Sequence, residues 1–224
     1  MKNRLKLCQR TLPSYSRGEE RMNMVTHIVG GGVGIGALIV CTVRALHLGD
    51  GWDLVAALLY GLSMVTLYTM SSVYHGQRPG TAKKVLQVLD HCTIYLLIAG
   101  SYSIVALSAL RRQSAALGWG LFAFEWLLAI PAVTLTAIDL KRYRVFSMIC
   151  YLFMGWCILF FLPQARAALT EPGFNWLLSG GVAYTIGAVL YGIGSRKKWI
   201  HSVFHIFVVL GSVLQLICIV FFTL

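Results

Sequence analysis

The segment LVAALLYGLSMVTLYTMSSVYHGQ, residues 54–77, contains no Asp, Glu, Lys or Arg. A helix needs about 20 mainly apolar residues to cross the hydrocarbon core of a bilayer, so this segment is long enough to span one. Its last part holds Ser71 and His75, one helical turn apart, and a basic turn that contains Arg78 follows. The sequence therefore predicts a membrane-spanning helix with polar side chains near one face of the membrane.

The rest of the chain repeats this pattern of uncharged runs. Of the 224 residues, 58% are hydrophobic and 12% are charged, whereas about a quarter of the residues in a soluble domain are charged. Backbone N–H and C=O groups find no partners in lipid, so the spans should be helices. Glu125 interrupts one run, which counts as a span if that residue is tolerated. We predict an all-α integral membrane protein with seven transmembrane helices, near residues 25–46, 53–75, 86–109, 115–138, 145–164, 175–195 and 199–223.

Basic residues are distributed unevenly over the connections. Of the 19 Lys and Arg residues, fifteen lie in four segments on one side of the predicted bundle, 1–25, 75–85, 139–144 and 195–199. The remaining four lie near the alternate connections. The positive-inside rule then places the N-terminus in the cytoplasm and the C-terminus outside. The net charge of +11 is therefore a topology signal and does not indicate nucleic-acid binding.

The chain is predicted to have two parts. Residues 1–24 form a cytoplasmic basic N-terminal segment, and residues 25–224 form one seven-helix transmembrane domain. The connections between the predicted spans are short, so sequential helices should be antiparallel neighbours in a single bundle.

The glycine cluster GGGVGIG, residues 30–36, lies inside the first span and lacks the GxxxxGK[ST] pattern of a phosphate-binding loop. Gly30 and Gly34 are four residues apart, as are Gly32 and Gly36. This spacing lets membrane helices approach closely. We predict helix packing for this cluster and not nucleotide binding.

Polar residues within the spans gather at one depth. Such side chains are costly in hydrocarbon and usually face the interior of a bundle. With the predicted topology, the cytoplasmic ends of the first, second, third and seventh helices carry Glu20, Asn23, His27, Ser71, His75, Asp90, His201 and His205. Residues far apart in the sequence are thereby predicted to be neighbours.

The spacing of the histidines indicates metal chemistry. His201 and His205 are four residues apart, so both imidazoles project from one helix face, an arrangement that binds zinc. A third nitrogen from His75 leaves the fourth tetrahedral position to water, as in catalytic zinc sites. Ser71 is placed to hydrogen-bond near the metal, and Asp90 to orient or deprotonate the water. Interfacial histidines that only form hydrogen bonds are an equal alternative from the spacing alone.

Two further ionisable residues lie in the spans. His91 is adjacent to Asp90, about 100° around the helix, so we expect it to face away from the metal. Glu125 is an ionisable group in hydrocarbon, which suggests a functional site. The sequence shows no partner for it, and burial for structural reasons is an equal alternative.

Four stretches carry a family resemblance. These stretches are EERMNMVTHIVGG (19–31), SSVYH (71–75), LDHCTIYLLIAGSYS (89–103) and HSVFHIFVVLGSVLQ (201–215). In order and spacing they resemble the bacterial hemolysin III family, a branch of the progestin and adipoQ receptors. The resemblance runs from about Glu19 to the C-terminus and implies a multi-pass protein of a bacterial plasma membrane.

The resemblance also assigns roles to residues. It implies that His75, His201 and His205 are zinc ligands, and that Ser71 and Asp90 lie near the metal-bound water. The family's first-helix motif, whose role is less clear, corresponds to Glu20, Asn23 and His27.

The predicted site and the resemblance suggest a zinc-dependent hydrolase of lipid amide or ester bonds, similar to ceramidases, with a membrane lipid as substrate. Asp90 would act as general base, and Ser71 would help to stabilise the oxyanion. Such an enzyme would contribute to membrane lipid and fluidity homeostasis. The alternative is a non-enzymatic, receptor-like sensor of membrane state with a structural zinc site. A pore-forming hemolysin has the least support, because the chain is predicted to be an integral bundle.

Overall fold

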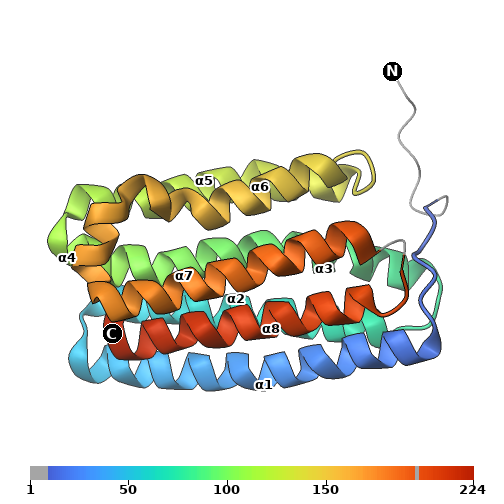
Figure 1. Cartoon of the computed structure of the whole chain (residues 1–224), viewed down its shortest axis with the longest axis horizontal. Helices are drawn as coiled ribbons and strands as arrows, with labels where there is room; N and C mark the ends of the chain where they lie inside the picture. The colour runs from blue at the N-terminus through green and yellow to red at the C-terminus, as the bar shows by residue number, and fades with distance from the viewer. Residues whose placement is uncertain (1–9, 195–196) are drawn as a thin grey trace.

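The computed structural model describes residues 10–194 and 197–224. Residues 1–9 of the predicted N-terminal segment, and Ser195 at the end of the predicted sixth helix, lie outside the described residues. The described chain is all helical, with π-helical η2 and η4 and a 3-10 helix η3. The elements in chain order (Figure 1) are α1 Arg17–Leu48, α2 Gly51–Gly76, α3 Thr81–Ile104, η2 Val105–Leu110, α4 Arg111–Gln113, α5 Ala115–Ile138, α6 Arg144–Trp156, η3 Cys157–Phe161, α7 Leu162–Gly194, α8 Ile200–Cys218 and η4 Ile219–Thr223.

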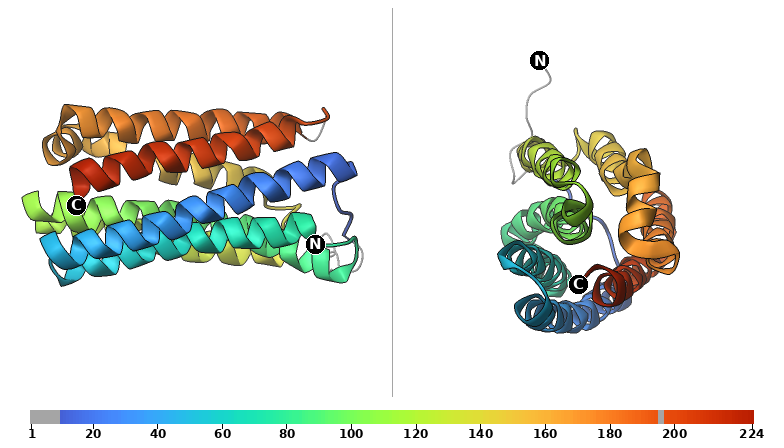
Figure 2. Two further views of the ribbon diagram at one scale, coloured as in Figure 1. Left: turned by 90° about the horizontal axis from the view of Figure 1, so that it is seen from below. Right: turned by 90° about the vertical axis from the view of Figure 1, so that its left-hand side faces the viewer.

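The long helices run lengthwise through one bundle, side by side in chain order (Figures 1 and 2). The end view in Figure 2 shows that α8 returns to lie beside α1. The start of α1 and the C-terminus therefore lie at opposite ends of the bundle. This arrangement brings the beginning of α1, the end of α2, the beginning of α3 and the beginning of α8 to the same end.

Six helical stretches of the described chain are long and apolar enough to cross a membrane. The fifth, Arg144–Gly194, has 51 residues; it covers the predicted span 145–164 and residues 175–194 of the predicted span 175–195. Within it the backbone leaves the helical region at Thr170, with φ 62° and ψ 165°, and α6 and α7 lie as separate rods in Figure 1. α5 has the predicted bounds, so Glu125 is indeed tolerated inside a helix.

The glycine cluster in α1 packs on α2 through one of its two predicted pairs. A Cβ atom on Gly30 would lie 2.5 Å from the ring of Tyr68, and one on Gly34 would lie 3.2 Å from the Cβ of Met64. A Cβ on Gly32 or Gly36 would meet nothing within 4 Å. Because α1 touches α2 along one face only, the second pair faces outward and takes no part in helix packing.

Two capping boxes set the beginnings of α1 and α2. The Ser16 side chain accepts from the backbone N–H of Glu19, and the Glu19 carboxylate accepts from the backbone N–H of Ser16. Asp50 and Asp53 form the same pair at the start of α2. Such caps satisfy N–H groups that have no partner in the first helical turn.

Ion pairs tie α2 to α4 at the end of the bundle that holds the C-terminus. Arg111 contacts Asp50 with Nη2 and Oδ2 2.5 Å apart, and Arg112 contacts Asp53 at 2.6 Å. The hydrogen bond from Arg111 holds the pKa of Asp50 below its usual range.

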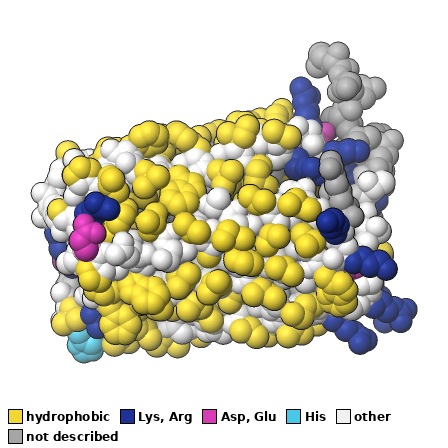
Figure 3. Space-filling view, viewed as in Figure 1, with side chains coloured by type: hydrophobic (Ala, Val, Ile, Leu, Met, Phe, Trp, Pro, Cys, Tyr) yellow, Lys and Arg dark blue, Asp and Glu magenta, His cyan; other side chains and the backbone are white. Residues whose placement is uncertain are grey.

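The molecular surface has an apolar belt between two charged ends. On the face that Figure 3 shows, hydrophobic side chains cover the middle, and Lys and Arg gather mainly at the end where α1 begins. Large apolar side chains on the outside include Val145, Leu127 and Phe221, which are 69%, 69% and 71% exposed. A belt of this kind matches the lipid-facing surface of a membrane bundle.

Candidate metal centre

Three histidines from α2 and α8 lie together at the end of the bundle where α1 begins. His75, His201 and His205 each offer one ring nitrogen, and these atoms lie within 4.8 Å of one another. His201 and His205, one turn apart on α8, have their Nε2 atoms 3.1 Å apart. All three residues are buried. The structure therefore brings together the three histidines that the sequence singles out.

The cluster has the donors and the spacing of a metal site. Tetrahedral zinc binds imidazole nitrogen at about 2.0–2.1 Å, which puts ligand atoms about 3.4 Å apart. Nε2 of His75 is buried and has no hydrogen-bond partner among the described residues. A buried polar atom without a partner is costly, and metal binding removes that cost. The residues present thus fit an ion held by imidazole nitrogens.

The first helix supports these rings. Glu20 Oε2 lies 2.7 Å from Nδ1 of His75, so a proton on Nδ1 is donated to the carboxylate. The amide nitrogen of Asn23 lies 3.4 Å from the same Nδ1. His27 stacks on His205 with ring centroids 3.8 Å apart. Each residue of the first-helix motif therefore touches one histidine of the cluster.

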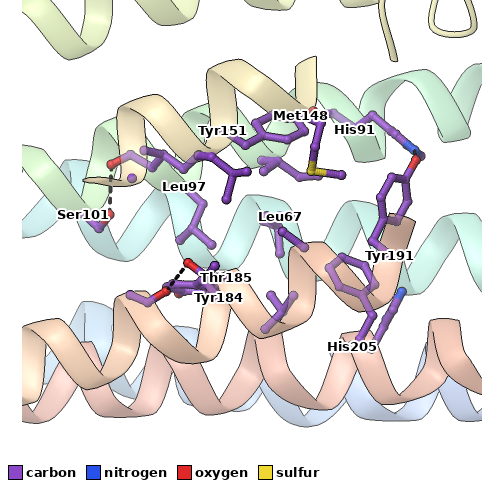
Figure 4. A pocket seen from close by; sticks show the side chains of 18 of the residues that line it. Leu67, His91, Leu97, Ser101, Met148, Tyr151, Tyr184, Thr185, Tyr191 and His205 are labelled. Carbon is purple, nitrogen blue, oxygen red and sulfur yellow. Dashed lines mark hydrogen bonds between the residues drawn. The ribbon is translucent and has the colours of Figure 1, made fainter. Parts of the chain in front are cut away.

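A cavity of about 150 Å³ begins at the histidine cluster. Its lining includes Ser71 and Asp90 as well as His201 and His205. Figure 4 shows the cavity running from the region of His205 to Ser101, between α3, α6 and α7. Ser71 and Asp90 thus share one space with the cluster, as the spacing predicts for their depth in the bundle.

His91 lines the same cavity as Asp90, although the sequence predicts that its ring faces away from the metal. Its Nε2 lies 3.0 Å from the hydroxyl of Tyr191 on α7 (Figure 4). His91 is nevertheless not one of the three clustered histidines.

Tyr15 covers the cluster on the side where α1 begins. Its ring stacks on His201, with centroids 4.9 Å apart and planes 15° apart, and its centroid lies 6.0 Å from that of His75. Burial raises the pKa of the Tyr15 phenol above its usual range, and the neighbouring Tyr191 adds to the rise. The phenol is therefore neutral at physiological pH.

Sequence reasoning missed Tyr15 and Lys83. It treats Lys83 as one of several basic loop residues, yet the structure buries this lysine beside Glu20, with Nζ 2.8 Å from Oε1. One signal was available, because Lys83 precedes Asp90 by seven residues and so lies on the same helix face. Tyr15 lies outside any helix, so periodicity gives no signal for it.

Glu125 has a partner that its sequence neighbourhood does not show. The thiol of Cys157 in η3 donates to Oε1 of Glu125 at 2.8 Å, and both side chains are buried. The two residues are 32 positions apart, so only the packing of α5 against η3 reveals the pair. Neither residue lines the cavity of the histidine cluster.

The fold and the site define a class of protein: an all-helical, multi-pass membrane protein with a buried histidine cluster between α2 and α8. The family of haemolysin-III-related proteins matches residues 15–216 of this chain. The chain is similar to "Hemolysin-3" of Bacillus cereus, with 36% identity over 206 residues that cover 92% of each protein. It therefore belongs to the hemolysin III family, as its motifs predict.

Two further relatives extend this comparison. The "Hemolysin-3 homolog" of Bacillus subtilis (strain 168) is 33% identical over 204 residues, which cover 91% of this chain and 94% of that protein. The "Monocyte to macrophage differentiation factor" of Homo sapiens is 26% identical over 167 residues, which cover 71% of this chain and 66% of that protein. The similarity thus extends to a mammalian protein.

Proposed function

We propose that the protein is a zinc-dependent hydrolase of lipid amide or ester bonds in a bacterial plasma membrane, where it contributes to lipid and fluidity homeostasis. One observation carries the proposal. The clustered nitrogens of His75, His201 and His205 lie at the end of a cavity that Asp90 and Ser71 also line.

In this proposal residues 25–224 form seven spans, with the N-terminus in the cytoplasm and the C-terminus outside. The break at Thr170, which separates two helical segments within Arg144–Gly194, supports the seventh span. The opposite positions of the start of α1 and the C-terminus support the assignment of the termini (Figure 1). The histidine cluster then lies at the inner leaflet.

The residues around the cluster have separate tasks. A zinc ion held by the imidazoles of His75, His201 and His205 would supply Lewis-acid chemistry, in which a carbonyl group is polarised and the pKa of a bound water is lowered to about 7. Asp90 accepts the proton of the attacking water as general base. Ser71, buried in the cavity wall, donates a hydrogen bond to the substrate oxygen that becomes an oxyanion. Glu20 holds His75 in the tautomer that leaves Nε2 free as a ligand.

The walls of the cavity support an acyl lipid as substrate. Away from the histidines the lining is mainly apolar and includes Leu67, Ile94, Leu97, Ile98, Leu152 and Val208. Each methylene buried against such side chains contributes about 0.8 kcal/mol. An acyl chain that lies along this wall would have its carbonyl group near the polar end, beside Asp90 and the histidines.

A second candidate function is a sensor of membrane state with a structural metal. The observation that favours it is a set of side-chain hydrogen bonds between helices around the cluster. Asn23 Oδ1 accepts from Ser202 Oγ at 2.6 Å, and Glu20 pairs with His75, so α1 is joined to α8 and to α2. A metal ion between His75 and the α8 histidines would add one more link of the same kind.

The substitution Asp90→Asn separates the two functions. Asparagine keeps nearly the same volume but lacks a basic oxygen, and general base assistance is worth about 10²–10⁴ in rate. We expect purified Asp90→Asn protein to retain zinc and to release fatty acid from a lipid amide more slowly by about that factor. Zinc content by metal analysis and fatty-acid release by chromatography are measured on the same preparation.

The double substitution His201→Ala with His205→Ala is the control for the metal. It should abolish zinc binding, because two of the three imidazoles are gone. Full zinc content in this variant would show that the metal binds elsewhere. A zinc-loaded Asp90→Asn protein with undiminished turnover or cellular function would refute the hydrolase and favour the sensor.

A further inference from the structure

Lys83 is a buried cation directly behind the histidine cluster. Its side chain is 4% exposed, and a lysine is almost never fully buried unless it is paired. Nζ lies 2.8 Å from Glu20 Oε1, and it donates to the backbone carbonyl oxygens of Gln77 at 3.0 Å and His75 at 3.4 Å. An ammonium group has three N–H donors, so every donor of Lys83 has an acceptor.

The carboxylate of Glu20 bridges Lys83 and the metal-binding histidine. One oxygen, Oε1, faces Nζ of Lys83, and the other, Oε2, lies 2.7 Å from Nδ1 of His75. The three groups come from α1, α2 and α3 and form one chain of charge-assisted hydrogen bonds. Such bonds are stronger and more directional than those between neutral groups.

The position of Lys83 is set by α2, the helix that carries His75. Besides the carbonyl oxygens at the end of α2, the ring of Tyr74 lies under the ammonium, with Nζ 5.0 Å from its centroid. These contacts fix the position of the Lys83 ammonium relative to α2. The ammonium in turn fixes the position of the Glu20 carboxylate, with which it forms an ion pair. The carboxylate is thereby held with Oε2 2.7 Å from Nδ1 of His75.

We propose that Lys83 is a positioning residue of the metal centre. It holds Glu20 so that Oε2 accepts the Nδ1 proton of His75, which directs Nε2 of His75 toward the two histidines of α8. This inference rests on the proposed metal centre but not on hydrolysis. Removing a group that supports a metal-binding histidine weakens metal affinity by about 10–100-fold, and we expect Lys83→Met to fall in this range.

A purely structural role makes a different prediction. Cations often bind the last carbonyl oxygens of a helix, and Lys83 does so at the end of α2. If this were its only task, its loss would act independently of Glu20. A double-mutant cycle separates the two roles, because only interacting residues deviate from additivity.

The experiment uses the full chain in detergent and four variants: Lys83→Met, Glu20→Gln, the double variant and Arg78→Met. Arg78→Met is the matched control, since it removes a positive charge from an exposed position of the same connection. Zinc affinity is measured by competition with a chromophoric chelator, and the d–d bands of the cobalt-loaded protein report the geometry of the ligands.

We expect Lys83→Met and Glu20→Gln each to weaken zinc binding by about 10–100-fold and to shift the cobalt bands. Adding Lys83→Met to Glu20→Gln should change the affinity by no more than about twofold, and Arg78→Met should stay within the same limit. The double variant removes both charges of the pair, so neither is left unpaired. If Lys83→Met alone does not fold, the zinc affinity of the double variant can still be compared with that of Glu20→Gln.

Unchanged affinity and cobalt spectrum in Lys83→Met would overturn the inference while the metal centre stands. Additive losses in the cycle would also overturn it and assign Lys83 to the end of α2 alone. If the unmodified protein bound no zinc or cobalt, the proposed metal centre itself would be refuted, and this inference with it.

Discussion

Gly30 and Gly32 are two residues apart in α1 and have opposite surroundings. Gly30 lies against the ring of Tyr68, and nothing lies within 4 Å of the position that a Cβ would take on Gly32. Tyr68 cannot easily move aside, because its hydroxyl lies 2.6 Å from Ser212 Oγ and 3.3 Å from the carbonyl oxygen of Val208 on α8. Because Gly30 has only a hydrogen atom as its side chain, α1 can pack closely against Tyr68 of α2, which also contacts α8.

This contrast predicts the effect of adding one methyl group. Gly30→Ala should lower the free energy of unfolding by about 1–3 kcal/mol, as overpacked positions do. Gly32→Ala is the matched control and should be neutral or stabilising by up to about 1 kcal/mol, because alanine favours the helix. Denaturant unfolding in detergent, followed by circular dichroism, measures both. Equal effects of the two substitutions would contradict the close packing of α1 on α2.

The segment before α1 joins several elements at the end of the bundle that holds the site. Arg10 Nη2 donates to the carbonyl oxygen of Ile138, at the end of α5, at 2.9 Å. At the other end of the segment, Ser16 caps α1, and Glu19 Oε1 accepts from the backbone N–H of Trp199, just before α8, at 2.8 Å. Tyr15 is thereby held with its ring on His201.

Tyr15 should therefore slow the exchange of a bound metal with the aqueous phase. A stacked aromatic pair contributes about 0.5–1.5 kcal/mol, so in Tyr15→Ala a water-soluble chelator should remove zinc about two- to tenfold faster. Tyr15→Phe keeps the ring and should behave like the unmodified protein. Stopped-flow chelation measures the rates. Identical rates in all three proteins would show that the ring does not limit access.

At the scale of the whole molecule, the apolar belt and the charged ends describe how the bundle sits in a bilayer. Lys and Arg gather mainly at the end that also carries the histidine cluster (Figure 3). From the positive-inside rule we expect this end to face the cytoplasm. The site would be reached from the inner leaflet.

Cysteine labelling tests this orientation. In a background with Cys8→Ser, a cysteine at position 4 should be protected from an impermeant thiol reagent in intact cells, and one at position 224 should react. The other native cysteines, Cys41, Cys92, Cys150, Cys157 and Cys218, are buried and should contribute little signal. Lysed cells serve as the control, in which both positions react. The reverse pattern in intact cells would place the histidine cluster at the outer leaflet.

The amino-acid sequence was enough to predict the helical class, the approximate bounds of α2 and α5, and the end of the bundle at which the polar residues gather. Each of these follows from the one-dimensional position of a residue along an apolar run, which lipid constrains directly. The same reasoning brought His75 on α2 to the depth of His201 and His205 on α8. The spacing of the α8 pair placed both imidazoles on one face, because four residues make about one helical turn.

The directions in which side chains point around each helix axis became visible in the packed bundle and could not be predicted from the sequence. Gly30 faces α2 while Gly32 faces outward, and His91 lines the cavity with its Nε2 3.0 Å from the hydroxyl of Tyr191. The burial of Lys83 against Glu20 depends on the joint packing of α1, α2 and α3. Rotation about a helix axis is set by contacts between residues far apart in the chain, so no local pattern encodes it.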